Sequence, residues 1–204
     1  MLVRESDLTT YARIRNAALE GFAQRGVAST GIRDVAGAAG VSPGLVQHHF
    51  GTKAGLRAAV DEYVREVVIG AFSGLIPMKA KDPIRVYGDR ITELVREHPM
   101  ALLYVARSLA DGDEAAHSLF DTFFAFSRER WTEMAEDGRL RPDVDVDWAA
   151  LHAIMWPVAT VLFGPAIERN LGKPFAGEEL DRWNEASRML FGYSAYDPRR
   201  RPRT

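Results

Sequence analysis

The residues best suited to bind another molecule lie near the N-terminus, between positions 30 and 53. Several of them carry cationic or hydrogen-bonding groups, and small residues that favour turns lie among them. Such groups bind the phosphates and base edges of duplex DNA. The candidate DNA-binding residues are Thr30, Arg33, Ser42, Pro43, Gly44, Leu45, Gln47, His48, Thr52 and Lys53.

The charge distribution favours the same end of the chain as a DNA-binding region. Residues 1–60 hold seven basic and four acidic side chains, residues 61–196 hold 15 and 23, and residues 197–204 hold four and one. The net charges of +3, −8 and +3 agree with the total of −2. A polyanion would be attracted to the first segment and repelled by the second, which orients the molecule.

The elements that must position these residues are helices. Apolar residues recur at three- and four-residue steps along the chain, and no segment shows the sustained alternation of a strand. We therefore expect an all-α fold: a three-helix DNA-binding domain with a helix-turn-helix, followed by a larger helical bundle for dimerisation and ligand binding. The expected helices cover residues 7–24, 32–39, 43–50, 53–72, 84–98, 100–110, 114–136, 148–170 and 178–191, with a loop at 74–83.

Two of the short helices form a helix-turn-helix pattern. Gly40 permits a sharp reversal, and the alanines around it let two helix axes approach closely. Ser29 and Thr30 are suited to cap the first helix of the pair. Ser42 can cap the second, where Pro43 occupies the first turn. The second helix of such a pair enters the major groove of DNA.

Residues 10–56 resemble the DNA-binding domain of the TetR family of regulators. The matching segments are TYARIRNAALEGFAQRG, STGIRDVAGAAGVSPGLVQHHF and GTKAGL. The resemblance implies a ligand-responsive regulator, most often a repressor, that binds a palindromic operator as a homodimer. We divide the chain into a DNA-binding domain (1–55), a ligand-binding and dimerisation domain (56–196) and a tail (197–204), which we expect to be disordered because it is rich in arginine and proline. Gln47 replaces a tyrosine that usually contacts the DNA backbone in the family, which leaves the operator sequence open.

The expected roles at the DNA follow from side-chain chemistry. Lys53 and the backbone amides near Thr30 and Thr52 should bind phosphates, because helix N-termini offer free N–H groups. Arg33 is placed either to read guanine or to bind phosphate, with an internal salt bridge as the alternative. His48 should face the groove, whereas His49 should pack or bond near the backbone.

The C-terminal helices are the expected dimer interface and the central helices the expected ligand pocket. An apolar face would meet a partner through Trp148, Leu151, Met155, Val158, Leu162, Ile167, Trp183, Met189, Leu190 and Phe191. A small, largely apolar effector would bind near Tyr104, Arg107, His117, Phe120, Phe123, Phe124, Trp131 and Trp156. The alternative for both sets is ordinary intrachain core.

Several other classes of protein are disfavoured. The chain has no cysteine, and it lacks the Gly-x-Ser-x-Gly, P-loop, dinucleotide and His-Glu-x-x-His patterns. We therefore expect no catalysis, no metal and no cofactor. Residues 1–20 have no signal-peptide pattern, and the apolar run 148–163 is too broken for a bilayer span, so we expect a cytoplasmic protein that is not in a membrane. An architectural DNA-binding protein without an effector, or a helical enzyme, are the alternatives.

Overall fold

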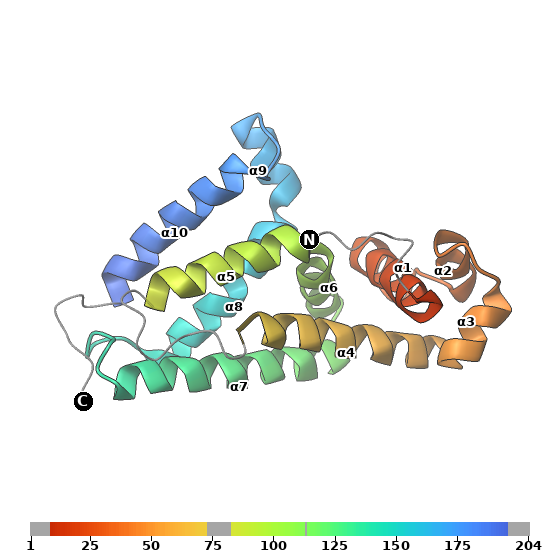
Figure 1. The fold of residues 1–204 in the computed structure, drawn as a ribbon, viewed down its shortest axis with the longest axis horizontal. Coiled ribbons are helices and arrows are strands. Elements are labelled where there is room, and N and C mark those ends of the chain that lie inside the picture. Colours follow the sequence, from red (N-terminus) through yellow and green to blue (C-terminus); the bar gives the residue numbers. More distant parts are fainter. Residues whose placement is uncertain (1–8, 73–82, 113, 196–204) are drawn as a thin grey trace.

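A computed structural model describes residues 9–72, 83–112 and 114–195 of the chain (Figure 1). These residues form helices and no β-strand, as the sequence predicts. The helices are α1 (Thr10–Arg25), α2 (Ile32–Ala38), α3 (Pro43–Phe50), α4 (Lys53–Phe72), α5 (Pro83–Glu97), α6 (Pro99–Ala110), α7 (Glu114–Glu136), α8 (Val146–Leu162), α9 (Gly164–Leu171) and α10 (Glu178–Ala195). Most of the predicted loop at 74–83 and all of the tail at 197–204 lie outside the described residues.

Helices α1 to α3 gather at one end of the molecule (Figure 1). Thr9 caps α1, because its Oγ1 accepts a hydrogen bond from the amide of Ala12 at 3.2 Å. Gly26 ends α1 with φ at +85°, a conformation that favours glycine. At α2 the structure corrects the predicted cap: Gly31 is the N-cap residue, and its amide donates to Asp34 Oδ2 at 2.8 Å.

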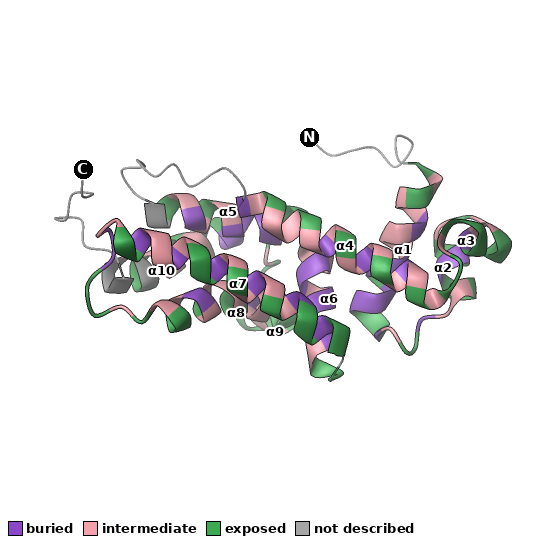
Figure 2. Ribbon diagram, turned by 90° about the horizontal axis from the view of Figure 1, so that it is seen from below, coloured by how far each residue is buried: buried purple, intermediate pink, exposed green. Residues whose placement is uncertain are grey.

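Helix α4 connects this end to the rest of the bundle (Figure 1). Its apolar stripe of Leu56, Val60 and Val64 is almost fully buried. That stripe belongs to one core cluster with α1, α2 and α3 and also with residues of α6 and α7, such as Tyr104. The core therefore continues across the predicted domain boundary at residue 55, and Figure 2 shows buried positions recurring along α4 and α7.

The body contains α5 to α10. Where the sequence predicts one helix over 148–170, the structure has two, α8 and α9, which meet at a bend of 65°. The reason is local, because Gly164 and Pro165 begin a new helix after Phe163. In the part of the chain that the structure describes, no single helix is long and apolar enough to cross a membrane, and only the bent pair α8 and α9 passes that test when counted together.

Candidate DNA-binding surface and ligand pocket

Helix α3 is anchored on one side and open on the other. Val46 is completely buried and packs into the core shared with α1 and α4. Ser42 caps the helix, since its Oγ accepts from the amide of Leu45 at 3.2 Å. Because Pro43 has no N–H and the amides of Leu45 and Val46 are bound to Ser42, Gly44 is the one residue of this first turn whose amide is left for an anion.

The turn between α2 and α3 is fixed from a third helix. Gly40 has φ at +65°, and the amide of Val41 donates to the carbonyl of Ala36 at 2.9 Å. Arg13 of α1 donates from Nη2 to the carbonyl of Ala39 at 3.0 Å. Sequence reasoning missed Arg13, because nothing in its local pattern indicates that it reaches a turn 26 residues away.

Apart from Leu45, the predicted contacts of α3 lie on its exposed face. Leu45 is half-buried, and His49 is exposed and meets the ring of Tyr11 edge-on at 6.2 Å. Arg33 is exposed on α2. The exposed residues of α3 and its cap are Ser42, Pro43, Gly44, Gln47, His48 and His49.

The predicted phosphate contacts divide into two cases. Lys53 and Thr52 lie at the start of α4; Lys53 Nζ donates to the carbonyl of Ala28 at 3.2 Å, and Thr52 Oγ1 accepts from the amide of Gly55 at 3.1 Å. Thr30 is different and corrects the prediction. Only 1% of it is exposed, and its hydroxyl is bound to backbone carbonyls at 2.9 and 3.0 Å. Its side chain supports the α1–α2 turn and does not reach the surface.

A partly buried polar contact joins α4 to α6. The hydroxyl of Tyr104 donates to Asp61 Oδ1 at 2.5 Å, and Arg57 forms an ion pair with the same carboxylate at 3.6 Å. Burial raises the pKa of Tyr104, and the hydrogen bond and the charge of Asp61 raise it further. The contact ties the helix that follows the DNA-binding end to the body, because α4 supplies the acid and α6 the phenol.

A cavity of about 270 Å³ lies between α5, α7, α8 and α10. Its walls are mainly aromatic and apolar, with a few polar groups at the edge. The lining residues are Tyr87, Gly88, Ile91, Trp131, Val144, Asp145, Trp148, Ala149, His152, Ala153, Trp156, Ser187 and Arg188. An aromatic wall of this kind suits a small apolar ligand.

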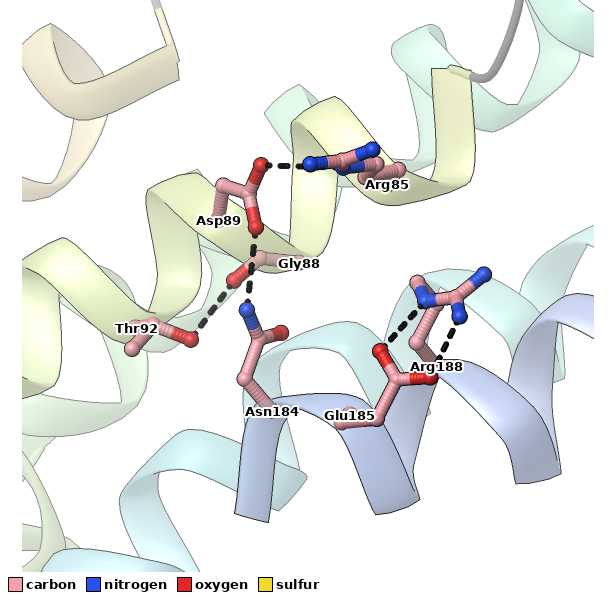
Figure 3. Close-up of polar contacts among 7 residues, drawn as sticks. All are labelled: Arg85, Gly88, Asp89, Thr92, Asn184, Glu185 and Arg188. Carbon is pink, nitrogen blue, oxygen red and sulfur yellow. Dashed lines mark hydrogen bonds and ion pairs between the residues drawn. The ribbon is translucent and has the colours of Figure 1, made fainter. Parts of the chain in front are cut away.

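Helices α5 and α10 approach closely beside this cavity (Figure 3). A Cβ atom at Gly88 would lie 2.9 Å from Asn184 Oδ1, so only glycine fits there without a shift. Asn184 Nδ2 donates to Asp89 at 3.0 Å, and Figure 3 shows Asp89 also paired with Arg85. The polar contacts therefore hold the two walls of the cavity together on one side.

Several other polar groups of the cavity are already engaged. Asp145 caps α8 by accepting from the amides of Asp147 and Trp148 at 3.0 and 3.1 Å. Trp156 Nε1 donates to Ser187 Oγ at 3.0 Å. Arg188 is bound to Glu185 through two guanidinium nitrogens (Figure 3). Burial raises the pKa of Tyr87 from its ordinary value of 10 to about 12.

The cavity corrects most of the predicted pocket. Trp131 and Trp156 line it, and Phe123 lines a smaller neighbouring cavity of about 40 Å³. The other predicted residues lie elsewhere. Tyr104 is core, Phe120 and Phe124 are half-buried outside the cavity lining, His117 is exposed, and Arg107 Nη2 donates to the carbonyl of Gln24 at 3.4 Å. For Tyr104 and Arg107 the physical reason is the packing of α6, from which Tyr104 reaches Asp61 of α4 and Arg107 reaches Gln24 of α1.

The predicted dimer residues also separate into two groups. Val158 and Trp183 pack against the second core cluster of the chain, which corrects their assignment to a partner interface. Leu151 and Ile167 are half-buried. Trp148 lines the cavity while 56% of it is exposed, and the side chain of Phe191 lies outside the described residues. The predicted dimer residues that remain exposed are Met155, Leu162, Met189 and Leu190.

Within the described ranges, no group of three or more metal-binding side chains is arranged to hold an ion. The arrangement instead offers two binding surfaces. One is the polar, exposed face of α3 and the start of α4, and the other is the aromatic cavity of the body.

Comparisons with known proteins agree with this division. A family model described as "Bacterial regulatory proteins, tetR family" matches residues 14–60, which run from α1 into α4. The transcriptional regulatory protein RaaS of Mycobacterium tuberculosis is 37% identical over 143 residues. That match covers 70% of this chain and 65% of RaaS, so the chain spans slightly less than two thirds of the length of that relative.

A second relative is matched over more of its length. The transcriptional repressor Rv3405c of Mycobacterium tuberculosis is 30% identical over 175 residues, which cover 83% of this chain and 81% of the relative. Among solved structures, the fold is similar to that of the ketosteroid transcriptional regulator KstR2 of Mycobacterium tuberculosis, with a TM-score of 0.71 and 17% identity, over 93% of this chain and 96% of KstR2. These relatives are transcriptional regulators, which confirms the predicted class over the enzyme alternative. The chain therefore belongs to the TetR family of bacterial regulatory proteins.

Proposed function

We propose that this chain is a ligand-responsive transcriptional repressor that binds a palindromic operator as a homodimer. The observation that carries the proposal is the position of α3, whose buried Val46 fixes the helix while its opposite face stays in solvent. A recognition helix needs both properties, because it must be held rigidly and still reach the groove. Its place of action is the cytoplasm, where the operator lies.

The DNA contacts follow from the chemistry of the exposed groups. Gln47 offers a donor and an acceptor that match the edge of adenine, and His48, the next residue, is also exposed. Arg33 on α2 supplies a guanidinium for guanine or phosphate. Lys53 retains two ammonium hydrogens beyond its bond to Ala28, which are available to a phosphate. The amide of Gly44 at the start of α3 and those of Lys53 and Ala54 at the start of α4 add further phosphate contacts.

The proposed dimer rests on where apolar side chains remain exposed. Within the described residues, all the exposed large hydrophobic side chains except Tyr11 lie on or between α8, α9 and α10. Single exposed apolar residues are ordinary, but a group of this size on adjoining helices marks an interaction surface. A twofold dimer through this face would present two copies of α3 to two half-sites.

The proposed effector site is the aromatic cavity, and the route to the DNA passes through α4. The cavity shares Tyr87 and Ala153 with a smaller cavity that reaches Val68 and Phe72 of α4. Farther along α4, Asp61 is bound to Tyr104 of α6. A ligand that fits the cavity differently in two positions of α4 would shift the population between them and release the operator.

The experiment that tests this proposal first identifies the operator and then measures how tightly the chain binds it. Selection of bound fragments from a random duplex pool, followed by fluorescence anisotropy over a range of salt concentrations, gives the site and its salt dependence. Lys53→Ala should weaken all sequences alike and lower the salt slope by about one, whereas Arg33→Ala should cost roughly 1–3 kcal/mol on the operator if it reads a base. Equal losses for Arg33→Ala on operator and random DNA would make it a phosphate contact. A chain that binds no duplex at low salt would refute the proposal.

A further inference from the structure

Tyr87 of α5 lies between the two cavities of the body. It lines the cavity of about 270 Å³ and also the neighbouring cavity of about 40 Å³, as does Ala153 of α8. Its ring meets that of Trp131, a wall of the larger cavity, edge-on at 6.1 Å. It also lies 5.0 Å from the ring of Phe72, a wall of the smaller cavity. A molecule that fills the inner end of the larger cavity therefore meets the ring of Tyr87.

Phe72 connects this ring to the DNA-binding end of the molecule. It is the last residue of α4, and it is buried in the same core cluster as Tyr87. Leu56 and Val64 of α4 are buried instead in the cluster shared with α1, α2 and α3. Helix α4 thus joins two cores, and a displacement of Phe72 moves one end of a helix whose first residue is Lys53.

The backbone beside Tyr87 is packed tightly against α10 (Figure 3). A Cβ atom on Gly88 would lie 2.9 Å from Asn184 Oδ1, and Asn184 Nδ2 donates to Asp89 at 3.0 Å. On the same turn of α5, Thr92 Oγ1 donates to the carbonyl of Gly88 at 2.9 Å. Because α10 blocks a retreat of α5, pressure on the ring of Tyr87 turns the side chain and does not move the helix.

The smaller cavity determines what that turn displaces. Its volume of about 40 Å³ holds a few water molecules at most and is too small for a phenol ring. A ring of Tyr87 that turns away from the larger cavity therefore displaces the walls of the smaller one, to which α4 contributes Val68 and Phe72. Close-packed interiors transmit such a displacement because they have little free volume to absorb it.

We propose that Tyr87 transmits ligand binding in the aromatic cavity to α4, so that a ligand weakens operator binding only when it presses this ring toward Phe72. This inference rests on the proposed effector site and adds a requirement on the ligand. An apolar molecule that reaches the inner end of the cavity acts as an effector. One that occupies only the outer end, beside the partly exposed Trp148 and Trp156, binds without releasing the operator.

Two alanines of α8, one turn apart, allow the same pressure to be applied without a ligand. Ala153 lines both cavities, as Tyr87 does, whereas Ala149 lines only the larger of the two. Ala153→Phe should weaken operator binding about 5- to 150-fold, the usual range of coupling between two sites. Ala149→Phe is the matched control and should bind the operator as the wild type does. Fluorescence anisotropy of labelled operator gives the affinities, and urea unfolding shows that each variant is folded.

Substitutions of Tyr87 itself show whether the pressure passes through its ring. Tyr87→Leu should bind the operator normally, and combined with Ala153→Phe it should restore most of the lost affinity, because the added ring gains room. Tyr87→Phe keeps the ring and should not restore it. The double variants isolate the coupling between the two positions, since independent effects would simply add.

A fluorescent probe tests the coupling with α8 unaltered, and it decides the matter if Ala153→Phe does not fold. N-phenyl-1-naphthylamine is an uncharged aromatic molecule whose fluorescence increases in an apolar site. At saturation it should weaken operator binding by the wild type and by Tyr87→Phe. It should leave the operator affinity of Tyr87→Leu unchanged, although its fluorescence shows that it is still bound.

The outcomes separate this inference from the proposed function. Equal operator affinity in folded Ala153→Phe and Ala149→Phe would overturn the inference, and so would an equal effect of the bound probe on the wild type and on Tyr87→Leu. Both results leave a DNA-binding regulator. A wild-type chain that binds no duplex would refute the proposed function. If the bound probe leaves the wild type unchanged while Ala153→Phe weakens it, the effector site fails and the coupling through Tyr87 stands.

Discussion

The exposed face of α3 comes from one short stretch of chain within residues 42–49, whereas the aromatic cavity takes its walls from residues as distant as Tyr87 and Arg188. One surface depends on a single helix that is anchored at Val46, and the other depends on how four helices pack. The two surfaces should therefore respond differently to amino-acid substitution. A substitution on α3 should change binding or folding according to which side of the helix it lies on. A substitution near the cavity should act by changing the distance between helices.

The largest expected effect tests the two sides of α3. Val46→Asp would bury a charge with no partner, and it should lower the free energy of unfolding by about 4 kcal/mol or more and abolish DNA binding. Gln47→Asp, at the next position, should leave the free energy of unfolding within about 0.5 kcal/mol and weaken DNA binding by repulsion from the phosphates. Urea unfolding followed by circular dichroism measures the first quantity. Equal destabilisation by both variants would show that α3 is not one-sided.

A smaller loss is expected where the α1–α2 turn supports α3. Thr30→Val leaves the shape of the side chain but removes the donor that serves the carbonyls of Gly21 and Gly26. The free energy of unfolding should fall by about 1–3 kcal/mol, because buried acceptors lose their partner. Thr30→Ser keeps the hydroxyl and should lose less, as measured by urea unfolding. If Thr30→Val kept normal stability but bound DNA more weakly, Thr30 would be a DNA contact and not a support of the turn.

High pH should affect the cavity end through Tyr87. Burial raises its pKa to about 12, above the ordinary value of 10. The folded chain keeps this proton between pH 10 and 12 while the unfolded chain loses it. The free energy of unfolding should therefore fall as pH rises through that window, by up to about 1.4 kcal/mol per pH unit. Unfolding measured at pH 9 and 11 should show a smaller decrease in Tyr87→Phe than in the wild type.

The pH dependence of Tyr87→Phe has a contribution from a second buried tyrosine and a matched control. The pKa of Tyr104 is also raised, chiefly by burial and then by Asp61, so the Tyr87→Phe variant keeps part of the slope. Tyr11→Phe is the control, because the side chain of Tyr11 is 42% exposed and lies at the opposite end of the molecule. An identical slope in the wild type and in Tyr87→Phe would mean that Tyr87 reaches solvent.

The smallest expected effect concerns the spacing of α5 and α10. Gly70→Ala should raise the free energy of unfolding by about 0.5–1 kcal/mol, since a Cβ there meets no atom within 4 Å and alanine favours the helix. Gly88→Ala should lack this gain, because its Cβ would meet Asn184 Oδ1 at 2.9 Å and strain the bond from Asn184 to Asp89. Thermal unfolding of the two variants gives the difference. An equal gain at both glycines would show that α10 moves away freely.

Local features of α3 could be predicted from the sequence, whereas contacts between distant residues could not. The turn at Gly40, the cap at Ser42 and the bounds of α3 were predictable, because each depends on residues within one or two turns of helix. Thr30 was assigned to the surface because its hydroxyl suits a cap equally well. Only the folded chain shows that Gly21 and Gly26 take that hydroxyl and leave Gly31 as the cap. Arg13 gave no signal at all, because its partner Ala39 lies in the turn after α2, 26 residues along the chain.

The sequence by itself determined the helical class, the helix-turn-helix and which side of α3 is anchored, because periodicity, caps and glycine turns act over short stretches of chain. The tertiary structure alone decided where the cavity lies and which apolar residues remain outside. Periodicity marks a helix face as apolar without naming its neighbour. Tyr104, Trp183 and Trp156 have the same chemical character in the sequence, and only the packing of α5, α6, α8 and α10 divides them among core, core edge and cavity wall.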